Sequence, residues 1–393
     1  MKIAVVTYVK TATCNYGAEL QGYALQYKLN KMGFQTEVLD LHRVLPGNNS
    51  FINNTVMAIK KRYKNLTFLS ATYSTVLLIV SVLKDKYYSK KRHELFEEKR
   101  KMFHAFFNDN IHHSKKEYYP EDLDTANLDY DTYIAGSDQI WNFKNSDRVD
   151  VFFLMFANRF KAKKISYAAS FSVSEIPLEL RKSYKNWIEN IDYLSVRETA
   201  GVKIIEDLTG RKAQLVCDPT LLLSKNEWMR QFPAPEKPLV KSKYVVIYSM
   251  SRSSCVFDVA KKIASKLGGI EIINIKINFT PTSIKGIVDF YDVTPQTWLW
   301  LICNAEYVVT DSFHGTAFSI NFNKQFVTIQ KKISDLNSRV DTILTKFNLK
   351  DRIYYDDNSK AIPSSSIDYE KINERLEEWR QMSLNFLISS LNA

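Results

Sequence analysis

The sequence predicts an α/β protein made of two doubly wound, Rossmann-type domains that face each other across a cleft. Short apolar runs typical of buried parallel strands alternate with helical segments, and polar loops follow many of the strands. A proline-containing, charged stretch at 224–243 separates two such series and predicts a linker. The expected organisation is an N-terminal α/β domain over 1–223 with a helical, basic insertion at about 44–128, the linker, a C-terminal α/β domain over 244–365, and terminal helices over 366–393.

The elements of the first domain follow from apolar periodicity. Residues 2–9 predict a buried strand, 20–32 a helix that ends at Gly33, and 34–41 the next strand. Further strands are expected at 130–135, 164–168 and 191–196, followed by a helix at 201–208. Such repeated strand, loop and helix units are typical of one doubly wound domain.

The insertion at about 44–128 interrupts this alternation of strands and helices. Residues 65–83 contain no charged side chain, and basic residues flank them within 60–92. Three interpretations compete: a transmembrane span, an interfacial helix on an anionic membrane surface, and a helical hairpin packed on the domain. Seven polar residues in the stretch count against a span, whereas the amphipathic pattern and the basic flanks suit the interfacial helix.

The second domain repeats the pattern. Strands are expected at 244–248, 270–277, 307–309 and 325–329. Ser251–Ser254 should cap a helix that ends at Gly268 and Gly269, and Pro295 should lie in the first turn of another helix. One or two helices are expected over 366–391.

Composition limits the function classes. The 393 residues are 45% hydrophobic and 25% charged, which is typical of a soluble globular protein of two or three domains. The net charge of +11 suits an anionic partner, but no basic tail, zinc-finger spacing or RNA-binding signature supports nucleic acid. Only 11 glycines occur, in neither a Walker A nor a G-x-G-x-x-G pattern.

The cysteines and the start of the chain predict a location. Cys14, Cys217, Cys255 and Cys303 are scattered and form no C-x-x-C pair, so neither a zinc site nor a redox dithiol is expected. No metal-ligand spacing of histidines and carboxylates occurs, and no required metal or cofactor is expected. No secretory apolar region precedes the first strand, which predicts a cytoplasmic protein. An interfacial helix within 60–92 would place it at the inner face of the cytoplasmic membrane.

His314 lies where the strand at 307–309 ends and a helix begins. In open α/β sheets ligands bind at this position, beside the free N–H groups of a helix N-terminus. An imidazole there can transfer protons next to a bound anion, or it can simply cap the helix.

Five polar loops stand at predicted strand ends. They are Asn15–Gly17, Ser137–Trp141, Ser195–Glu198, Ser251–Ser254 and Ser312–Gly315. Three belong to the first domain and two to the second. Two doubly wound domains with functional loops on both lips of a cleft are the design of GT-B glycosyltransferases.

Six segments together resemble the polysaccharide pyruvyl transferase family. They are Asn-Tyr-Gly-Ala-Glu-Leu-Gln (15–21), Gly-Ser-Asp-Gln-Ile-Trp-Asn (136–142), Leu-Ser-Val-Arg-Glu (194–198), Cys-Asp-Pro-Thr-Leu-Leu-Leu (217–223), Thr-Asp-Ser-Phe-His-Gly-Thr-Ala-Phe-Ser (310–319) and Asn-Ser-Arg-Val (337–340). The resemblance covers the chain outside 44–128. It implies a GT-B-like fold and transfer of a pyruvyl group from phosphoenolpyruvate to a glycan as a ketal, with release of phosphate.

The resemblance also implies roles for residues. His314 would be the general acid/base, with Asp138 as an alternative base that could instead hold its own loop. Arg197 is the first choice for binding the donor anion. The remaining candidates for the donor are Arg252, Ser312, Gly315 and Arg339, and those for the acceptor or cleft are Asn15, Tyr16, Gly17, Gln139 and Trp141.

Two positions depart from the family pattern. Other members have an arginine two residues before the histidine, where this chain has Ser312, and Arg252, Arg339, Lys331 or Lys332 could supply the missing cation. An acidic residue that often follows Asn-x-Gly is Ala18 here. The partners expected are phosphoenolpyruvate and a glycan acceptor, which a membrane lipid could carry. The alternatives are a GT-B glycosyltransferase that uses a nucleotide sugar, and a non-catalytic, membrane-surface component of polysaccharide assembly.

Overall fold

The computed structural model describes residues 1–10, 14–42, 93–236, 239–251, 253–277, 279, 281–332, 337–357, 361–363 and 365–393. The uncharged stretch at 65–83, with its three competing interpretations, its basic flanks in 60–92 and the predicted donor ligand Arg252 lie outside these residues. No helix in the described part of the chain is long and apolar enough to cross a membrane.

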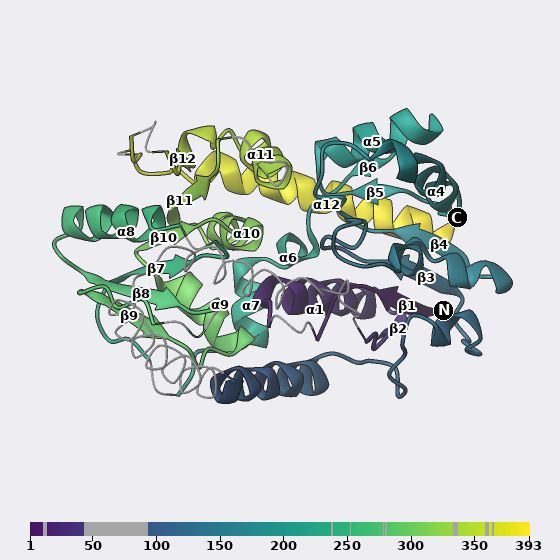
Figure 1. The fold of residues 1–393 in the computed structure, drawn as a ribbon, viewed down its shortest axis with the longest axis horizontal. Coiled ribbons are helices and arrows are strands. Elements are labelled where there is room, and N and C mark those ends of the chain that lie inside the picture. Colours follow the sequence, from purple (N-terminus) through teal and green to yellow (C-terminus); the bar gives the residue numbers. More distant parts are fainter. Residues whose placement is uncertain are drawn as a thin grey trace, which may run out of the picture.

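The N-terminal lobe is built on a parallel sheet with the strand order β2-β1-β3-β4 (Figure 1). Its strands are β1 (Lys2–Val6), β2 (Gln35–Val38), β3 (Thr132–Ala135) and β4 (Lys163–Ser166). Isolated bridges join β4 and the loop after it to a short parallel pair, β5 (Ser195–Val196) and β6 (Gln214–Leu215). In β1, Ile3 and Val5 face one hydrophobic cluster while Ala4 and Val6 face another, as expected for a parallel strand covered on both sides.

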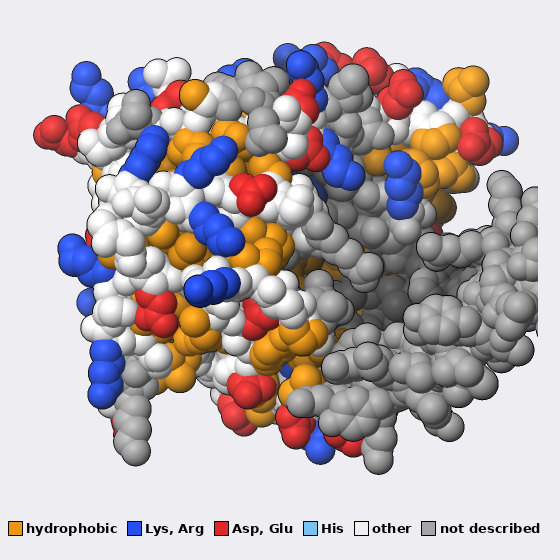
Figure 2. All heavy atoms as spheres, turned by 60° about the vertical axis from the view of Figure 1, so that its left-hand side comes forward, with side chains coloured by type: hydrophobic (Ala, Val, Ile, Leu, Met, Phe, Trp, Pro, Cys, Tyr) orange, Lys and Arg blue, Asp and Glu red, His pale blue; other side chains and the backbone are white. Residues whose placement is uncertain are grey.

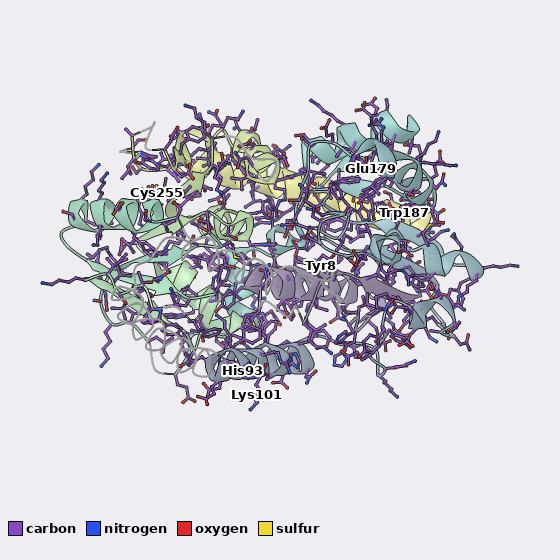
Figure 3. All side chains as sticks on the ribbon, in the orientation of Figure 1. Tyr8, His93, Lys101, Glu179, Trp187 and Cys255 are labelled. Carbon is purple, nitrogen blue, oxygen red and sulfur yellow. The ribbon has the colours of Figure 1, made fainter. Side chains whose placement is uncertain are left out.

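Helices cover both faces of this sheet. They are α1 (Tyr16–Lys31), a helix over 93–110, α4 (Leu178–Glu189), α5 (Thr199–Thr209), α6 (Pro219–Leu222) and α7 (Lys225–Gln231), with short 3₁₀ helices η1 (Asp122–Asp124), η2 (Val149–Phe153) and η3 (Met155–Arg159). In Figure 1 the helix over 93–110 lies below α1, and Figure 3 labels His93 and Lys101 on it.

The C-terminal lobe contains a six-stranded parallel sheet with the order β12-β11-β10-β7-β8-β9. Its strands are β7 (Tyr244–Tyr248), β8 (Glu271–Ile275), β9 (Ile287–Phe290), β10 (Tyr307–Thr310), β11 (Gln325–Gln330) and β12 (Ile353–Tyr355). Its helices are α8 (Cys255–Lys266), α9 (Pro295–Asn304), α10 (Phe313–Asn321) and α11 (Asn337–Lys346), with a 3₁₀ helix η4 (Lys350–Arg352). Figure 3 labels Cys255 at the start of α8.

One hydrophobic cluster runs through both lobes. It joins Ile3 and Val5 of β1 with Val246 of β7 and Trp298 of α9, while separate clusters fill the outer side of each sheet. The inner helices, α1, α9 and α10, therefore pack against one another between the two sheets. This shared core holds the two lobes together, so that the segments that follow β1 and β10 meet at Gly17 and His314.

The last helix, α12 (Glu370–Asn392), runs from the C-terminal lobe back across the N-terminal lobe (Figure 1). Its buried Arg380 donates hydrogen bonds to the carbonyl of Leu221 and to the side chain of Asn321. Ser383 accepts a hydrogen bond from the backbone N–H of Cys217 (2.9 Å). The helix thus ties α6, α10 and the end of β6 together.

Two regions differ in detail from the expectation. The stretch at 224–243 includes α7, because Ser224 and Glu227 form a capping box that starts a helix there. Residues 111–128 of the insertion form no α-helix; they run beside β2 and make parallel bridges from Val38 to His113 and from Leu41 to Tyr118. The terminal region is a single helix, α12, which agrees with the expected one or two helices.

The positive charge is dispersed on the face that Figure 2 shows. Lysine and arginine side chains lie singly there among acidic, apolar and uncharged groups. The four cysteines are buried and none forms a disulfide.

Candidate active site

His314 stands at the carboxyl end of β10, in the first turn of α10. Ser312 is the N-cap of this helix, and its hydroxyl accepts a hydrogen bond from the N–H of Gly315 (3.4 Å). Gly315 is required by packing, because a Cβ there would lie 2.2 Å from the hydroxyl oxygen of Thr310. The local sequence therefore fixes the helix start, and with it the buried imidazole.

The N-terminal lobe meets the imidazole at Gly17. Asn15 caps α1 by accepting a hydrogen bond from the N–H of Gly17 (3.0 Å). A Cβ on Gly17 would lie 2.0 Å from Nδ1 of His314, so only glycine lets the first turn of α1 approach so closely. The imidazole is therefore enclosed between the first turns of α1 and α10, one from each lobe.

A buried ion cluster lies behind the imidazole. Arg197, which follows β5, is fully buried, and its guanidinium donates to Asp218 (2.6 Å) and Asp138 (3.2 Å). Glu198 lies 4.0 Å away, and its carboxylate accepts hydrogen bonds from the N–H groups of Phe171 and Ser172. Arg197 is thus already paired with carboxylates of its own lobe.

Asp218 connects this cluster to His314. Its Oδ2 lies 3.8 Å from Nε2 of His314 and accepts a hydrogen bond from the hydroxyl of Ser137 (2.8 Å), while its Oδ1 accepts from Thr220. Nε2 has no hydrogen-bond partner in the described part of the chain. A proton on Nε2 would face the carboxylate, and the proton-accepting lone pair would then be on Nδ1, the nitrogen beside Gly17.

Burial and charge set the protonation states. Burial lowers the pKa of His314 below its usual value, although Asp218 and Asp138 act in the opposite direction. Burial alone would raise the pKa of Asp218, but Arg197 and His314 outweigh it and bring the pKa to about 2. The resting state at neutral pH is therefore a neutral imidazole beside an ionised Asp218.

Arg339, in the first turn of α11, is a second buried arginine, and its surroundings differ from those of Arg197. With the Gln139 amide oxygen turned toward it, Gln139 accepts from both Nη1 and Nη2 at 2.9 Å. No carboxylate lies within ion-pair distance of Arg339 among the described residues, and its Nε has no partner there. Burial and the nearby Arg197 lower its pKa to about 10, so it stays charged at neutral pH.

Phe313 separates the two guanidinium groups. Its ring centroid lies 4.5 Å from Cζ of Arg197 and 5.8 Å from Cζ of Arg339. The ring thus packs against both cations.

These groups border one cavity of about 350 Å³ between the lobes. The side of the N-terminal lobe supplies Asn15, Asp138 and Gln139, and the C-terminal lobe supplies, among others, Ser251, Ser253, Asp311, Ser312, Phe313, His314, Lys331 and Arg339. Asp311 orders the loop after β7, since its carboxylate accepts hydrogen bonds from the hydroxyl of Ser249 (2.7 Å) and from the N–H groups of Met250 (2.6 Å) and Ser251 (2.9 Å).

The structure thus brings six predicted site residues to the cavity and places others behind its wall. Asn15, Asp138, Gln139, Ser312, His314 and Arg339 line it. Arg197, Gly17 and Gly315 lie directly behind these residues. Of the other cations considered, Lys331 lines the cavity, whereas Lys332 lies 3.5 Å from Asp357 at the surface.

Tyr16 and Trp141 are core residues. The Tyr16 ring stacks on Trp298 and its hydroxyl donates to the carbonyl of Val293 (2.9 Å). The Trp141 ring stacks on Phe153 and its Nε1 donates to the carbonyl of Phe152 (2.9 Å). Both side chains are fully buried, so neither presents a surface to a glycan in this structure, and we leave both out of the site.

Sequence reasoning did not assign Asp218, Asp311 and Phe313. Asp218 stands in the Cys-Asp-Pro segment after β6, which carried part of the family resemblance, and the structure shows that it also caps α6. No group of three histidine, cysteine or carboxylate side chains suited to a metal occurs among the described residues.

Comparison with known proteins decides the family. The sequence model of the polysaccharide pyruvyl transferase family matches residues 15–330, which is most of the chain. This chain belongs to the polysaccharide pyruvyl transferase family. No curated protein matches it.

Solved structures confirm the GT-B-like fold of this family member. The UDP-GlcNAc 2-epimerase from Methanocaldococcus jannaschii is similar with a TM-score of 0.50 and 11% identity, over 96% of this chain and 92% of that one. A putative UDP-N-acetylglucosamine 2-epimerase from Listeria monocytogenes has a TM-score of 0.50 and 7% identity, over 98% of this chain and 88% of that one. At these identities the likeness concerns the fold alone.

Proposed function

We propose that the protein transfers a pyruvyl group from phosphoenolpyruvate to a sugar of a cell-surface polysaccharide precursor, forming a pyruvate ketal and releasing phosphate. Family membership supports the substrate class. The observation that carries the proposal is that His314, a neutral imidazole, and Arg339, a buried cation without a carboxylate partner, line the same cavity.

The donor requires cationic and N–H groups, because phosphoenolpyruvate carries a carboxylate and a phosphate. Arg339 can supply its guanidinium, and the α10 N-terminus beside Ser312 can supply its positive dipole end. Arg339 thereby takes the place of the arginine that other family members carry at the position of Ser312. Lys331, at the rim of the cavity, adds a second cation.

Arg197 suits a supporting role better than direct donor binding. Its guanidinium is fully buried and bound to Asp138 and Asp218, so an anion would have to displace a carboxylate to reach it. In this position it holds both carboxylates ionised around His314. Its direct contact with the donor stays a prediction.

Ketal formation consumes two acceptor hydroxyls and releases one phosphate. Two acceptor hydroxyls add to C2 of phosphoenolpyruvate, and the C2–O bond to phosphate breaks. Of the two protons that the hydroxyls lose, one goes to the methylene carbon, which becomes the methyl group, and the other leaves on phosphate. Neutral His314 is suited to take the first hydroxyl proton, and Asp218 would stabilise the resulting imidazolium at 3.8 Å.

Turnover by a His314→Gln variant tests the proposal. With phosphoenolpyruvate and a glycan acceptor, the wild-type protein should release phosphate, and the variant should lose about a hundredfold or more of kcat, since positioned acid/base catalysis contributes about 10²–10⁴. Lys332→Met, at an exposed lysine outside the cavity, is the control and should turn over normally. Undiminished turnover by His314→Gln would refute the role of the imidazole.

A nucleotide-sugar reaction is the alternative that the fold leaves open. Calorimetric titration with phosphoenolpyruvate and with a panel of UDP-sugars separates the two. Binding of a UDP-sugar without binding of phosphoenolpyruvate would replace the proposal with a GT-B glycosyltransferase. A non-catalytic, membrane-surface role depends on 60–92, which lie outside the described residues, and remains a prediction.

A further inference from the structure

A second, larger cavity lies at the opposite end of the N-terminal sheet. It measures about 620 Å³ and opens where β1 and β2 begin, beside the end of α1. None of its lining residues borders the cavity that contains His314. Its volume falls within the range of about 300–1,000 Å³ that is usual for small-molecule sites. We call it the basal groove.

The walls of the basal groove combine aromatic rings with free amides. Phe34, Tyr118 and Tyr130 line it and are each partly buried. Gln35 and Asn127 also line it, and their exposed side-chain amides make no hydrogen bond to any described residue. Each amide therefore offers both donors and an acceptor to a ligand.

The charged side chains that the structure describes in the basal groove leave no free lysine or arginine. Lys2 forms an ion pair with Asp129 (2.6 Å), and the Glu37 carboxylate accepts a hydrogen bond from the Tyr130 hydroxyl (2.5 Å). His112 Nε2 lies 3.8 Å from Glu37. No unpaired lysine or arginine is among the lining residues, so the groove suits a neutral ligand and not a phosphate, a nucleotide or an acidic polymer.

A neutral sugar fits this combination of groups. A pyranose ring has C–H faces that pack on aromatic rings, and hydroxyl groups that pair with amides and carboxylates. We propose that the basal groove binds a neutral oligosaccharide segment. The groove would thus be a second glycan site, remote from the catalytic cavity. That this segment belongs to the acceptor polymer rests on the proposed function; the binding itself does not.

A remote site predicts a dependence on acceptor length. Only an acceptor long enough to reach both cavities gains from the second contact, because the two binding events then become intramolecular. Removing groove side chains should therefore raise KM for a long acceptor and leave KM for a short one unchanged.

Direct binding tests the groove without relying on turnover. The probes are neutral gluco-, galacto- and mannohexasaccharides, titrated into the full-length His314→Gln protein by ligand-observed NMR. At least one should bind, and Tyr130→Ala or Asn127→Ala should weaken it about tenfold, since a lost aromatic or paired polar contact has that order of effect. Tyr119→Ala, an exposed tyrosine outside the groove, is the matched control and should leave binding unchanged.

The outcomes separate the two proposals. Asn127 is exposed, so its substitution should not affect folding, and unfolding curves of both variants test whether each stays folded. No binding of any probe, or binding that neither variant weakens, would overturn the basal groove as a glycan site. Glycan binding by the groove, together with a wild-type protein that releases no phosphate from phosphoenolpyruvate, would reject the proposed function while the groove proposal stands.

Discussion

At the scale of single residues, the site depends on one glycine. Gly17 allows the first turn of α1 to lie against the imidazole, although the two belong to different lobes. The same contact explains why the Asn-Tyr-Gly segment and the Ser-Phe-His-Gly segment, nearly 300 residues apart in the chain, form one site.

Substitution of Gly17 tests this contact. Gly17→Ala should lower kcat at least about tenfold, because a methyl group 2.0 Å from Nδ1 must displace His314 or separate the lobes. The melting temperature should also fall. In a His314→Ala background the ring is absent, so the added methyl should cost much less stability, and the double-mutant cycle measures this coupling. Additive effects of the two substitutions would contradict the contact.

The state of His314 predicts a dependence of stability on pH. The folded protein holds the pKa of His314 below 6.5, so between that pKa and 6.5 the unfolded chain binds a proton that the folded chain does not. The free energy of unfolding should therefore fall as the pH decreases through this window. Asp138, Asp218, Arg197 and Arg339 face the imidazole, and the pKa values of both carboxylates are lowered.

Chemical denaturation at several pH values measures this effect. The decrease in stability toward low pH should be smaller in His314→Gln, which has no group to protonate at this position. An unchanged slope would show that His314 titrates alike in the folded and unfolded chains.

Among residues, sequence reasoning identified positions better than roles. His314, Asp138 and Arg339 were predicted in the site from strand-end position and motif. The pairing of Arg197 with carboxylates could not be predicted, because it depends on side chains from three separate loops. The burial of Tyr16 and Trp141 was also not apparent, since both stand in polar motifs after a predicted strand, which looked exposed.

At the scale of elements, the loop between β7 and α8 depends on the end of β10. The Asp311 carboxylate accepts three hydrogen bonds from 249–251, and this loop supplies Ser251 and Ser253 to the cavity. The neighbouring strands β7 and β10 thus build one side of the proposed donor site together.

Substitution of Asp311 should affect donor binding more than the chemical step. Asp311→Ala removes the carboxylate oxygens that accept hydrogen bonds from the loop at 249–251. The KM for phosphoenolpyruvate should therefore rise about tenfold or more, while kcat changes less. Hydrogen exchange of the amides of Met250 and Ser251 should become faster in the variant. A loss confined to kcat, with unchanged exchange, would show that the carboxylate acts in the chemistry and not on the loop.

The elements with clear signals were predicted and those without were not. Strands β1, β7, β10 and β11 are apolar runs, and the structure contains all of them. Strands β9 and β12 are short and mixed in character, and α4 has no side-chain cap, so none of the three had a clear signal. Helix α7 lies within the predicted linker. The prolines of 224–243 indicated a linker, and the capping box of Ser224 and Glu227 was not used as a helix signal.

At the scale of the whole molecule, α12 and the shared core hold the lobes together. Arg380 of α12 bonds to Leu221 beside the N-terminal lobe and to Asn321 at the end of α10, the helix that carries His314. This connection fixes the back of the cleft, where the two lobes meet.

Removal of the Arg380 guanidinium should destabilise the protein. Arg380→Met keeps much of the side-chain volume but leaves the Leu221 carbonyl and the Asn321 oxygen buried without donors, which costs about 1–3 kcal/mol. Urea denaturation measures the change, and Arg375→Met, on an exposed position of the same helix, is the control. Equal stability of the wild type and Arg380→Met would show that α12 is held by apolar packing alone.

The central claim is that the cavity bordered by His314 and Arg339 binds phosphoenolpyruvate, and calorimetric titration of this donor into Arg339→Met tests it most directly. We expect binding to one site in the wild type, unchanged binding in Lys332→Met, and affinity reduced at least about tenfold in Arg339→Met, because charged hydrogen bonds contribute about 1.5–3 kcal/mol. Equal affinities of the wild type and Arg339→Met would contradict it.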